Sequence, residues 1–170
     1  MAVQIETERK YLIRMPDESL LSSMDGCEIW DIEQIYLQDG PQGETRRIRS
    51  VLTDGKRKCF RTEKKRVSAL SSNEKEDEIP EAAYDALKKE ANPALNAIFK
   101  RRYRIPYAGR TLEIDIYTFW DDRATLEIEL PGENADASTP EWIEIIREVS
   151  GEYAYKNRCL AEKVPMEDIG

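Results

Sequence analysis

Charged residues recur at a spacing of two along nearly the whole chain, and they are the residues that could do chemistry. Successive residues of an extended segment point to opposite faces, so each such pair would present both side chains on one face. The pairs, with the lysines that share their pattern, are Glu6/Glu8 followed by Lys10, Arg47/Arg49, Thr62/Lys64, Glu74/Glu76, Lys100/Arg102, Glu113/Asp115 and Glu127/Glu129. The chain therefore carries both cationic and acidic pairs, distributed from its N-terminal to its C-terminal part.

The two sets suit two kinds of ligand. Arginines two residues apart present bidentate donors to phosphate oxygens, and lysines supply point charges. The chain has no histidine, which removes the usual general base and the Ser-His or Cys-His nucleophile pair. Grouped carboxylates without histidine or cysteine match hard cations such as Mg²⁺ or Mn²⁺. A polyphosphate held by the cations, with a divalent metal held by the acids, would satisfy both sets at once.

Each charged pair taken alone is more typical of a solvated strand face. Apolar residues at the alternate positions of the same segments argue for an enclosed charged face instead. The helices must cover an apolar face, so the apolar side of these strands would lie outside beneath the helices and the charged side would turn inward. These residues are Ile5, Tyr11 and Ile13 in the first segment, Leu112, Ile114 and Ile116 in a later one, and Leu126, Ile128 and Leu130 in the last. Buried unpaired charge is costly, so such an interior must be wet, ion-paired or filled by a charged ligand.

The elements that must position these residues follow from alternation and turn signals. Strands are expected over 4–13, 33–39, 44–52, 58–64, 74–79, 98–107, 111–119 and 125–130. Asp54-Gly55 is a hairpin signal, and 66–73 reads as a loop. Helices are expected after Pro16, over 81–91, and after Thr139-Pro140, where Trp142, Ile143 and Ile146 would form a docking face. The order strand, helix, three strands occurs twice, which suggests an internal duplication.

Eight strands are about the number at which an antiparallel sheet closes into a barrel. We therefore predict an α+β fold: an eight-stranded antiparallel β-barrel whose charged faces form a tunnel, with the helices packed outside. A single domain would cover residues 1–161, and residues 162–170 would be a frayed C-terminal tail.

Composition limits the function further. A chain of 170 residues suits one domain, and a net charge of −8 argues against general nucleic-acid binding. We find no apolar run that would span a membrane and no signal peptide, so a cytoplasmic protein is expected. The three cysteines are far apart and read as reduced and structural. The sequence leaves the oligomeric state open, a homodimer included.

These residues resemble a known family. Glu6-Thr7-Glu8-Arg9-Lys10 looks like the E-x-E-x-K signature of the CYTH family, or triphosphate tunnel metalloenzymes, which includes inorganic triphosphatases, thiamine triphosphatases and class IV adenylate cyclases. Further triplets match in order: Arg47-Ile48-Arg49, Thr62-Glu63-Lys64, Glu74-Lys75-Glu76, Lys100-Arg101-Arg102-Tyr103, Glu113-Ile114-Asp115, Glu127-Ile128-Glu129, Glu148-Val149-Ser150 and Tyr155-Lys156-Asn157. The chain departs from the family at Ser71-Ser72-Asn73 and at Arg61.

The resemblance implies the role of each residue. The metal, Mg²⁺ or Mn²⁺, would be held by Glu6, Glu8 and Glu129, with Glu127 nearby. The triphosphate would be held by Lys10, Arg47, Arg49, Lys64, Lys100 and Arg102. The attacking water would be oriented by Glu76, Glu113 or Asp115, among which the sequence does not choose. By similarity to thiamine triphosphatases, Tyr36 with Lys64 would protonate the leaving group, although packing is the simpler role for Tyr36.

The resemblance favours a metal-dependent hydrolase of inorganic triphosphate or another linear triphosphate. A class IV-type adenylate cyclase is the second interpretation, and it needs a base for the ribose hydroxyl and a place for adenine. A non-catalytic module that binds polyphosphate or nucleotides is the third.

Overall fold

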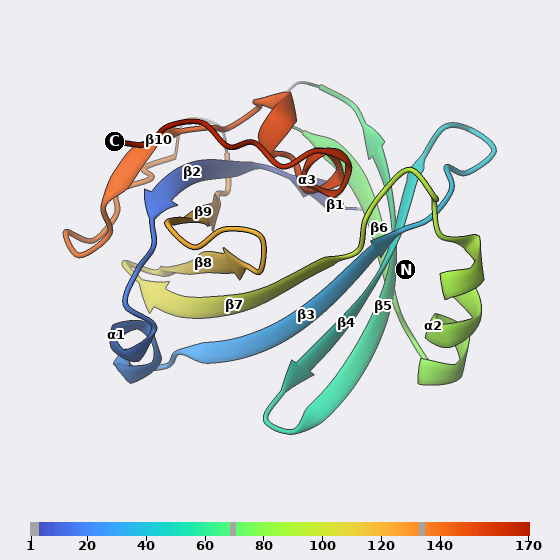
Figure 1. The fold of residues 1–170 in the computed structure, drawn as a ribbon, viewed down its shortest axis with the longest axis horizontal. Helices are drawn as coiled ribbons and strands as arrows, with labels where there is room; N and C mark the ends of the chain where they lie inside the picture. The colour runs from blue at the N-terminus through green and yellow to red at the C-terminus, as the bar shows by residue number, and fades with distance from the viewer. Residues whose placement is uncertain (1–3, 69–70, 133–134) are drawn as a thin grey trace.

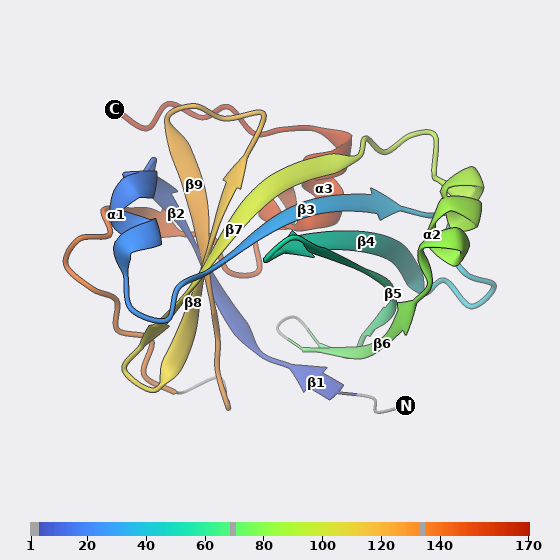
Figure 2. The same cartoon turned by 90° about the horizontal axis from the view of Figure 1, so that it is seen from below.

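One strongly curved antiparallel sheet forms the framework of the described chain (Figures 1 and 2). The computed structural model describes residues 4–68, 71–132 and 135–170, with side chains from Thr7 onward. The strands in these residues are β1 (Gln4–Glu6), β2 (Glu8–Arg14), β3 (Glu28–Tyr36), β4 (Thr45–Thr53), β5 (Lys56–Arg66), β6 (Ser72–Ile79), β7 (Ile98–Tyr107), β8 (Arg110–Tyr117), β9 (Arg123–Glu129) and β10 (Ile145–Glu148). They lie in the order β1-β6-β5-β4-β3-β7-β8-β9-β2-β10.

The sheet stays open, which corrects the predicted closed eight-stranded barrel. β1 and β2 follow one another with only Thr7 between them, yet β1 pairs with β6 and β2 pairs with β9. The chain thus brings the two ends of the curved sheet together, but only over the three residues Gln4–Glu6. Beyond them, the edge of β2 opposite β9 pairs with β10 instead. Closure along the full strand length is therefore lost.

Local sequence accounts for the turn between β4 and β5. Asp54 and Gly55 join β4 to β5 with φ angles of 51° and 73°. A two-residue hairpin turn of this type needs positive φ at both positions, which Asp-Gly tolerates. The turn fixes the register of β4 against β5, so Arg47 lies opposite Thr62 and Arg49 opposite Phe60.

Two short helices cover apolar patches on the outer face of the sheet (Figure 2). Leu21 of α1 (Glu18–Ser23) packs with the outward residues of β2, β7, β8 and β9. Tyr84 of α2 (Glu81–Leu87) packs against Ile48 and Cys59, and its hydroxyl donates to Glu33 at 2.6 Å. A short 3-10 helix, η1 (Lys88–Glu90), follows α2. The apolar parity predicted from the sequence thus lies outside, beneath the helices.

The helix predicted after Thr139-Pro140 is wrong. The segment forms a turn at 141–143 and then β10, which pairs with β2. Ile143 is still buried in the outer core and Trp142 packs against it. The apolar residues dock as expected, but the free edge of β2 offers backbone hydrogen bonds that stabilise a strand rather than a helix.

The C-terminal segment closes one side of the curved sheet. η2 (Tyr153–Tyr155) and α3 (Asn157–Glu162) form a core with Leu12, Tyr36, Ile98 and Tyr117. The tail is not frayed as predicted. The indole of Trp120 donates to the carbonyl of Pro165 at 3.0 Å, and Arg123 donates to the carbonyl of Glu167 at 2.6 Å. The described residues contain no helix of the length and apolarity that a membrane crossing needs.

Candidate functional site

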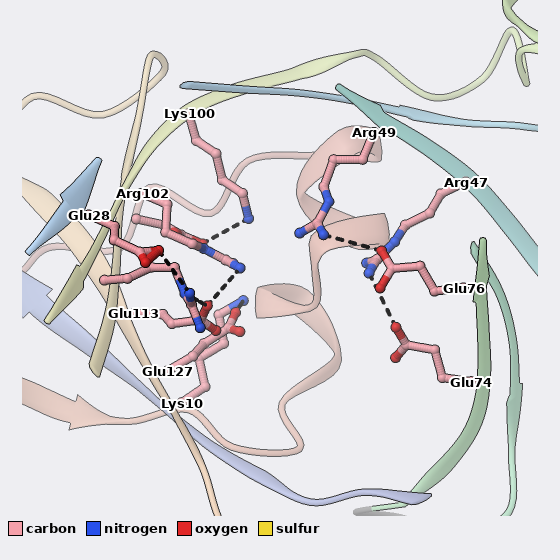
Figure 3. A network of polar contacts seen from close by, with 12 residues as sticks. Lys10, Glu28, Arg47, Arg49, Glu74, Glu76, Lys100, Arg102, Glu113 and Glu127 are labelled. Atoms are coloured by element: carbon pink, nitrogen blue, oxygen red, sulfur yellow. Dashed lines mark hydrogen bonds and ion pairs between the residues drawn. The ribbon is translucent and has the colours of Figure 1, made fainter. Parts of the chain in front are cut away.

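Strand register places the charged pairs on one continuous inner face. Lys10 lies opposite Glu127, Arg102 opposite Asp115, and Lys64 opposite Glu74. Adjacent strands keep residues of the same parity on the same face. The register therefore gathers the charged candidates of β2 and of β4 to β9 on this face. Figure 3 shows Lys10, Lys100, Arg102 and Glu127 on one side of the interior and Arg47, Arg49, Glu74 and Glu76 on the other.

The first set, which we call the buried cluster, consists of Lys10, Lys100, Arg102, Asp115 and Glu127, and each residue is at most 8% exposed. Asp115 accepts from Lys100 Nζ at 2.8 Å, and from Nε and Nη2 of Arg102 at 2.7 and 2.9 Å. Its two oxygens are thus saturated by two cations. A carboxylate that makes these contacts is suited to hold the cations in place rather than to orient water.

Lys10 and Glu127 complete the buried cluster. The ammonium of Lys10 donates to the backbone carbonyl of Tyr155 at 2.7 Å and lies 3.4 Å from Glu127 Oε1. The first of these contacts ties a predicted substrate lysine to η2. The C-terminal segment therefore takes part in orienting the interior charges.

Burial and ion pairing shift the pKa values of the residues in this cluster in opposite directions. Burial lowers the pKa of Lys100 to about 8 although Asp115 raises it. Burial would raise the pKa of Asp115, but Arg102 and Lys100 hold the pKa well below its usual range. Burial likewise raises the pKa of Glu127, while Lys10 and Arg102 bring the net shift downward. Both carboxylates are charged at neutral pH.

The second set, which we call the open cluster, consists of Arg47, Arg49, Lys64, Glu74 and Glu76 on β4, β5 and β6. Its ion pairs are longer than the contacts that Asp115 makes in the buried cluster. Arg49 lies 3.2 Å from Glu76, while Arg47 and Lys64 lie 3.8 and 3.7 Å from Glu74. The side chains of Lys64 and Glu76 are 34% and 36% exposed, so water reaches this cluster.

Arg49 links the two clusters. Its guanidinium points from β4 towards the buried cluster (Figure 3). Burial, together with the positive charges of Arg47 and Arg102, lowers the pKa of Arg49 to about 10, although Glu76 and Glu113 act in the opposite direction. Its partners thus come from both sides of the interior.

Glu113, the remaining candidate on β8, accepts from Arg102 at 3.2 Å and from Arg104 at 3.1 Å.

A cavity of about 480 Å³ opens beside the two clusters. Predicted residues that line it are Glu8, Lys10, Tyr36, Arg47, Lys64 and Glu127. Burial raises the pKa of Tyr36, whose hydroxyl accepts from Gln34 at 2.8 Å, and the charge of Arg47 partly offsets that rise. Tyr36 both packs and faces the cavity, so the structure accommodates either role that the sequence left open.

The residues predicted to hold a metal are only partly brought together. Glu8 and Glu129 are register partners, and two carboxylates directly opposite each other repel unless a cation is shared. Their oxygen donors suit Mg²⁺ or Mn²⁺. Glu127 lies beside Lys10 instead, and the side chain of Glu6 is outside the described residues. No group of three potential ligands gathers among the described side chains.

Sequence reasoning missed several cationic residues of the same cavity. Arg66, Lys156 and Arg158 also line it. Arg66 continues the spacing of Thr62 and Lys64 and ends β5, although the composition of 66–73 predicts a loop. Lys156 and Arg158 carry no periodic signal, because they follow the turn from η2 into α3.

Known proteins place this geometry in context. The chain is 35% identical over 112 residues to an inorganic triphosphatase of Acetivibrio thermocellus, a match that spans 62% of this chain and 66%, just under two thirds, of that protein. A crystal structure of the inorganic triphosphatase NE1496 has a TM-score of 0.59 at 23% identity and covers 95% of this chain and all of that chain. The PH1819 protein of Pyrococcus horikoshii has a TM-score of 0.55 at 21% identity, over 76% and 80% of the two chains. A scan against family profiles finds no match.

The ordered motifs, their common inner face and this similarity agree. The chain belongs to the CYTH family, the triphosphate tunnel metalloenzymes. Membership accounts for a mostly antiparallel sheet with few helices.

Proposed function

We propose that this CYTH protein hydrolyses a linear triphosphate, with inorganic triphosphate as the simplest substrate, and that it requires Mg²⁺ or Mn²⁺. The observation that carries the proposal is the pair of cationic clusters facing each other across one interior (Figure 3). Six lysines and arginines converge there in a protein with a net charge of −8. An acidic protein that concentrates cations in its interior is arranged to bind a small polyanion.

The two clusters would act differently on the substrate. Asp115 holds Lys100 and Arg102 in fixed positions, so these cations need no rearrangement when the anion arrives. In the open cluster, phosphate oxygens would replace Glu74 and Glu76 as partners of Arg47 and Arg49, because Arg47 lies 3.8 Å from Glu74 and the side chain of Glu76 is 36% exposed. Together the cations would neutralise the charge that spreads over the transferred phosphoryl group.

Hydrolysis also requires a positioned water. A water oxygen forms the new P–O bond, the bridging P–O bond to the leaving pyrophosphate breaks, and the proton of the water passes to a base. Glu76 is the best placed of the three predicted carboxylates, because Asp115 is saturated by two cations and Glu113 is shared between two arginines. Tyr36, beside Lys64 in the cavity, would return a proton to the leaving oxygen.

The facing carboxylates of β2 and β9 would hold the divalent metal. Glu8 and Glu129, with Glu6, would hold it, and Glu127 would stabilise Lys10 rather than bind the metal. When bound, the ion would supply charge neutralisation at the phosphate oxygens and lower the pKa of a bound water.

Phosphate release from inorganic triphosphate tests the proposal, assayed with Mg²⁺ and with Mn²⁺. We expect Glu8→Ala to lower the rate about 100-fold or more, since the metal contributes several kcal/mol. The exposed Glu141→Ala is the matched control and should retain the wild-type rate. Equal rates for Glu8→Ala and wild type would contradict the metal assignment.

The same assay separates the rival functions. Cyclic AMP formed from ATP would indicate a cyclase. Thermal stabilisation by triphosphate without phosphate release would indicate a binding module.

A further inference from the structure

Two cations, Arg66 and Lys156, line the cavity beyond the residues that the family motifs assign to the substrate, and with the assigned Lys64 they define what we call the mouth of the cavity. Lys64 and Arg66 come from the end of β5, and Lys156 comes from the turn between η2 and α3. All three line the cavity of about 480 Å³ that also contains Lys10 and Arg47. The mouth is thus continuous with the site of the proposed function.

Lys156 differs from the interior cations in its partners. Lys10, Arg47 and Lys64 each lie within 4 Å of a carboxylate. No ion pair joins Lys156 to an acid in the described part of the chain. Arg158, two residues further on, is paired with Asp39 at 3.5 Å. The cavity therefore has a lysine whose charge is not balanced by a neighbouring acid.

The surroundings of Lys156 are positive. Burial lowers the pKa of Lys156, and the nearby charges of Arg66 and Lys64 lower it further. Like charges held together destabilise the folded protein unless an anion is bound between them. A phosphate group, with several acceptor oxygens and about two negative charges, is the anion that lysine and arginine side chains suit best.

We propose that Lys156, together with Arg66 and Lys64, forms an additional subsite that binds the outermost phosphate of a linear phosphate chain. The inference rests on the proposed function, because it assumes that the chain lies in the same cavity. Lys156 is then a specificity-determining residue: it favours ligands that carry a phosphate at the mouth in addition to those held between the two clusters.

Titration calorimetry with inorganic triphosphate, with divalent metal removed by chelation, tests this subsite. The variant is Lys156→Gln, and the matched control is Lys65→Gln, which removes the same charge from the exposed outer face of β5. We expect Lys156→Gln to weaken binding about tenfold, as for the loss of a charged hydrogen bond, and Lys65→Gln to change it less than about twofold. Lys156→Arg should restore most of the affinity.

The unfolding temperature of the ligand-free protein distinguishes a binding role from a structural one. Because Lys156 faces other cations, Lys156→Gln should leave this temperature unchanged or raise it. A lower unfolding temperature, or triphosphate binding within twofold of wild type, would overturn the inference.

The outcomes also separate this inference from the proposed function. If the wild type hydrolyses triphosphate and Lys156→Gln binds triphosphate as tightly as the wild type does, the subsite alone is refuted. Lys156-dependent binding without hydrolysis refutes the proposed activity alone. No binding of triphosphate to the wild type would contradict both.

Discussion

The buried and open clusters consist of the same types of side chain, lysine, arginine and carboxylates, but they differ in how firmly those side chains are held. Asp115 binds Lys100 and Arg102 through contacts of 2.7–2.9 Å in a site that is 0–7% exposed. The ion pairs of Arg47 and Arg49 measure 3.8 and 3.2 Å and lie nearer water. A fully buried pair is costly to break, whereas a longer pair that is partly exposed contributes less. One side of the interior is therefore built to stay fixed, and the other to exchange partners.

The largest expected difference between the clusters is in folding stability. Asp115→Asn leaves Lys100 and Arg102 buried without their counter-charge, so it should lower the free energy of unfolding by about 3–5 kcal/mol. Glu74→Gln in the open cluster should lower it by less than about 1 kcal/mol. Urea denaturation of both variants measures the contrast. Equal losses would show that the two clusters are equally fixed.

The next effect is on pH dependence. The pKa of Lys100 is lowered to about 8 by burial, and only its protonated form attracts phosphate. The value of kcat/KM for triphosphate should therefore fall as pH rises through about 8, by up to tenfold per pH unit. In Lys100→Arg this decline should move to higher pH, because guanidinium groups stay charged. An unchanged decline in that variant would assign the titration to another group.

The smallest effect is on ligand affinity. Glu74 competes with phosphate for Arg47 and Lys64, so Glu74→Gln should strengthen triphosphate binding about two- to fivefold, the equivalent of an exposed ion pair. Titration calorimetry measures this gain, with the outer-face Glu63→Gln as the control. Weaker binding by Glu74→Gln would mean that Glu74 helps to hold the ligand, through a metal or a water.

The inner face was predictable from the sequence because side-chain alternation is local. Lys10, Arg49, Asp115 and Glu127 share one face whatever the sheet does at its edges. The hairpin at Asp54-Gly55 was predictable for the same reason.

Features that depend on distant parts of the chain were not predictable. Thr139-Pro140-Glu141 has the pattern of a helix start, but the open edge of β2, more than a hundred residues away, pairs with 145–148 as a strand. The same pairing leaves the barrel open. Lys156 reaches the cavity only because η2 and α3 dock on Leu12 and Tyr36, so no local pattern reveals it.

A crystal structure with a non-hydrolysable triphosphate analogue tests the central claim most directly. We predict that its phosphate oxygens lie within hydrogen-bond distance of Arg102 from the buried cluster and of Arg49 from the open cluster. An analogue bound on the outer face of the sheet, or in contact with one cluster only, would contradict the account.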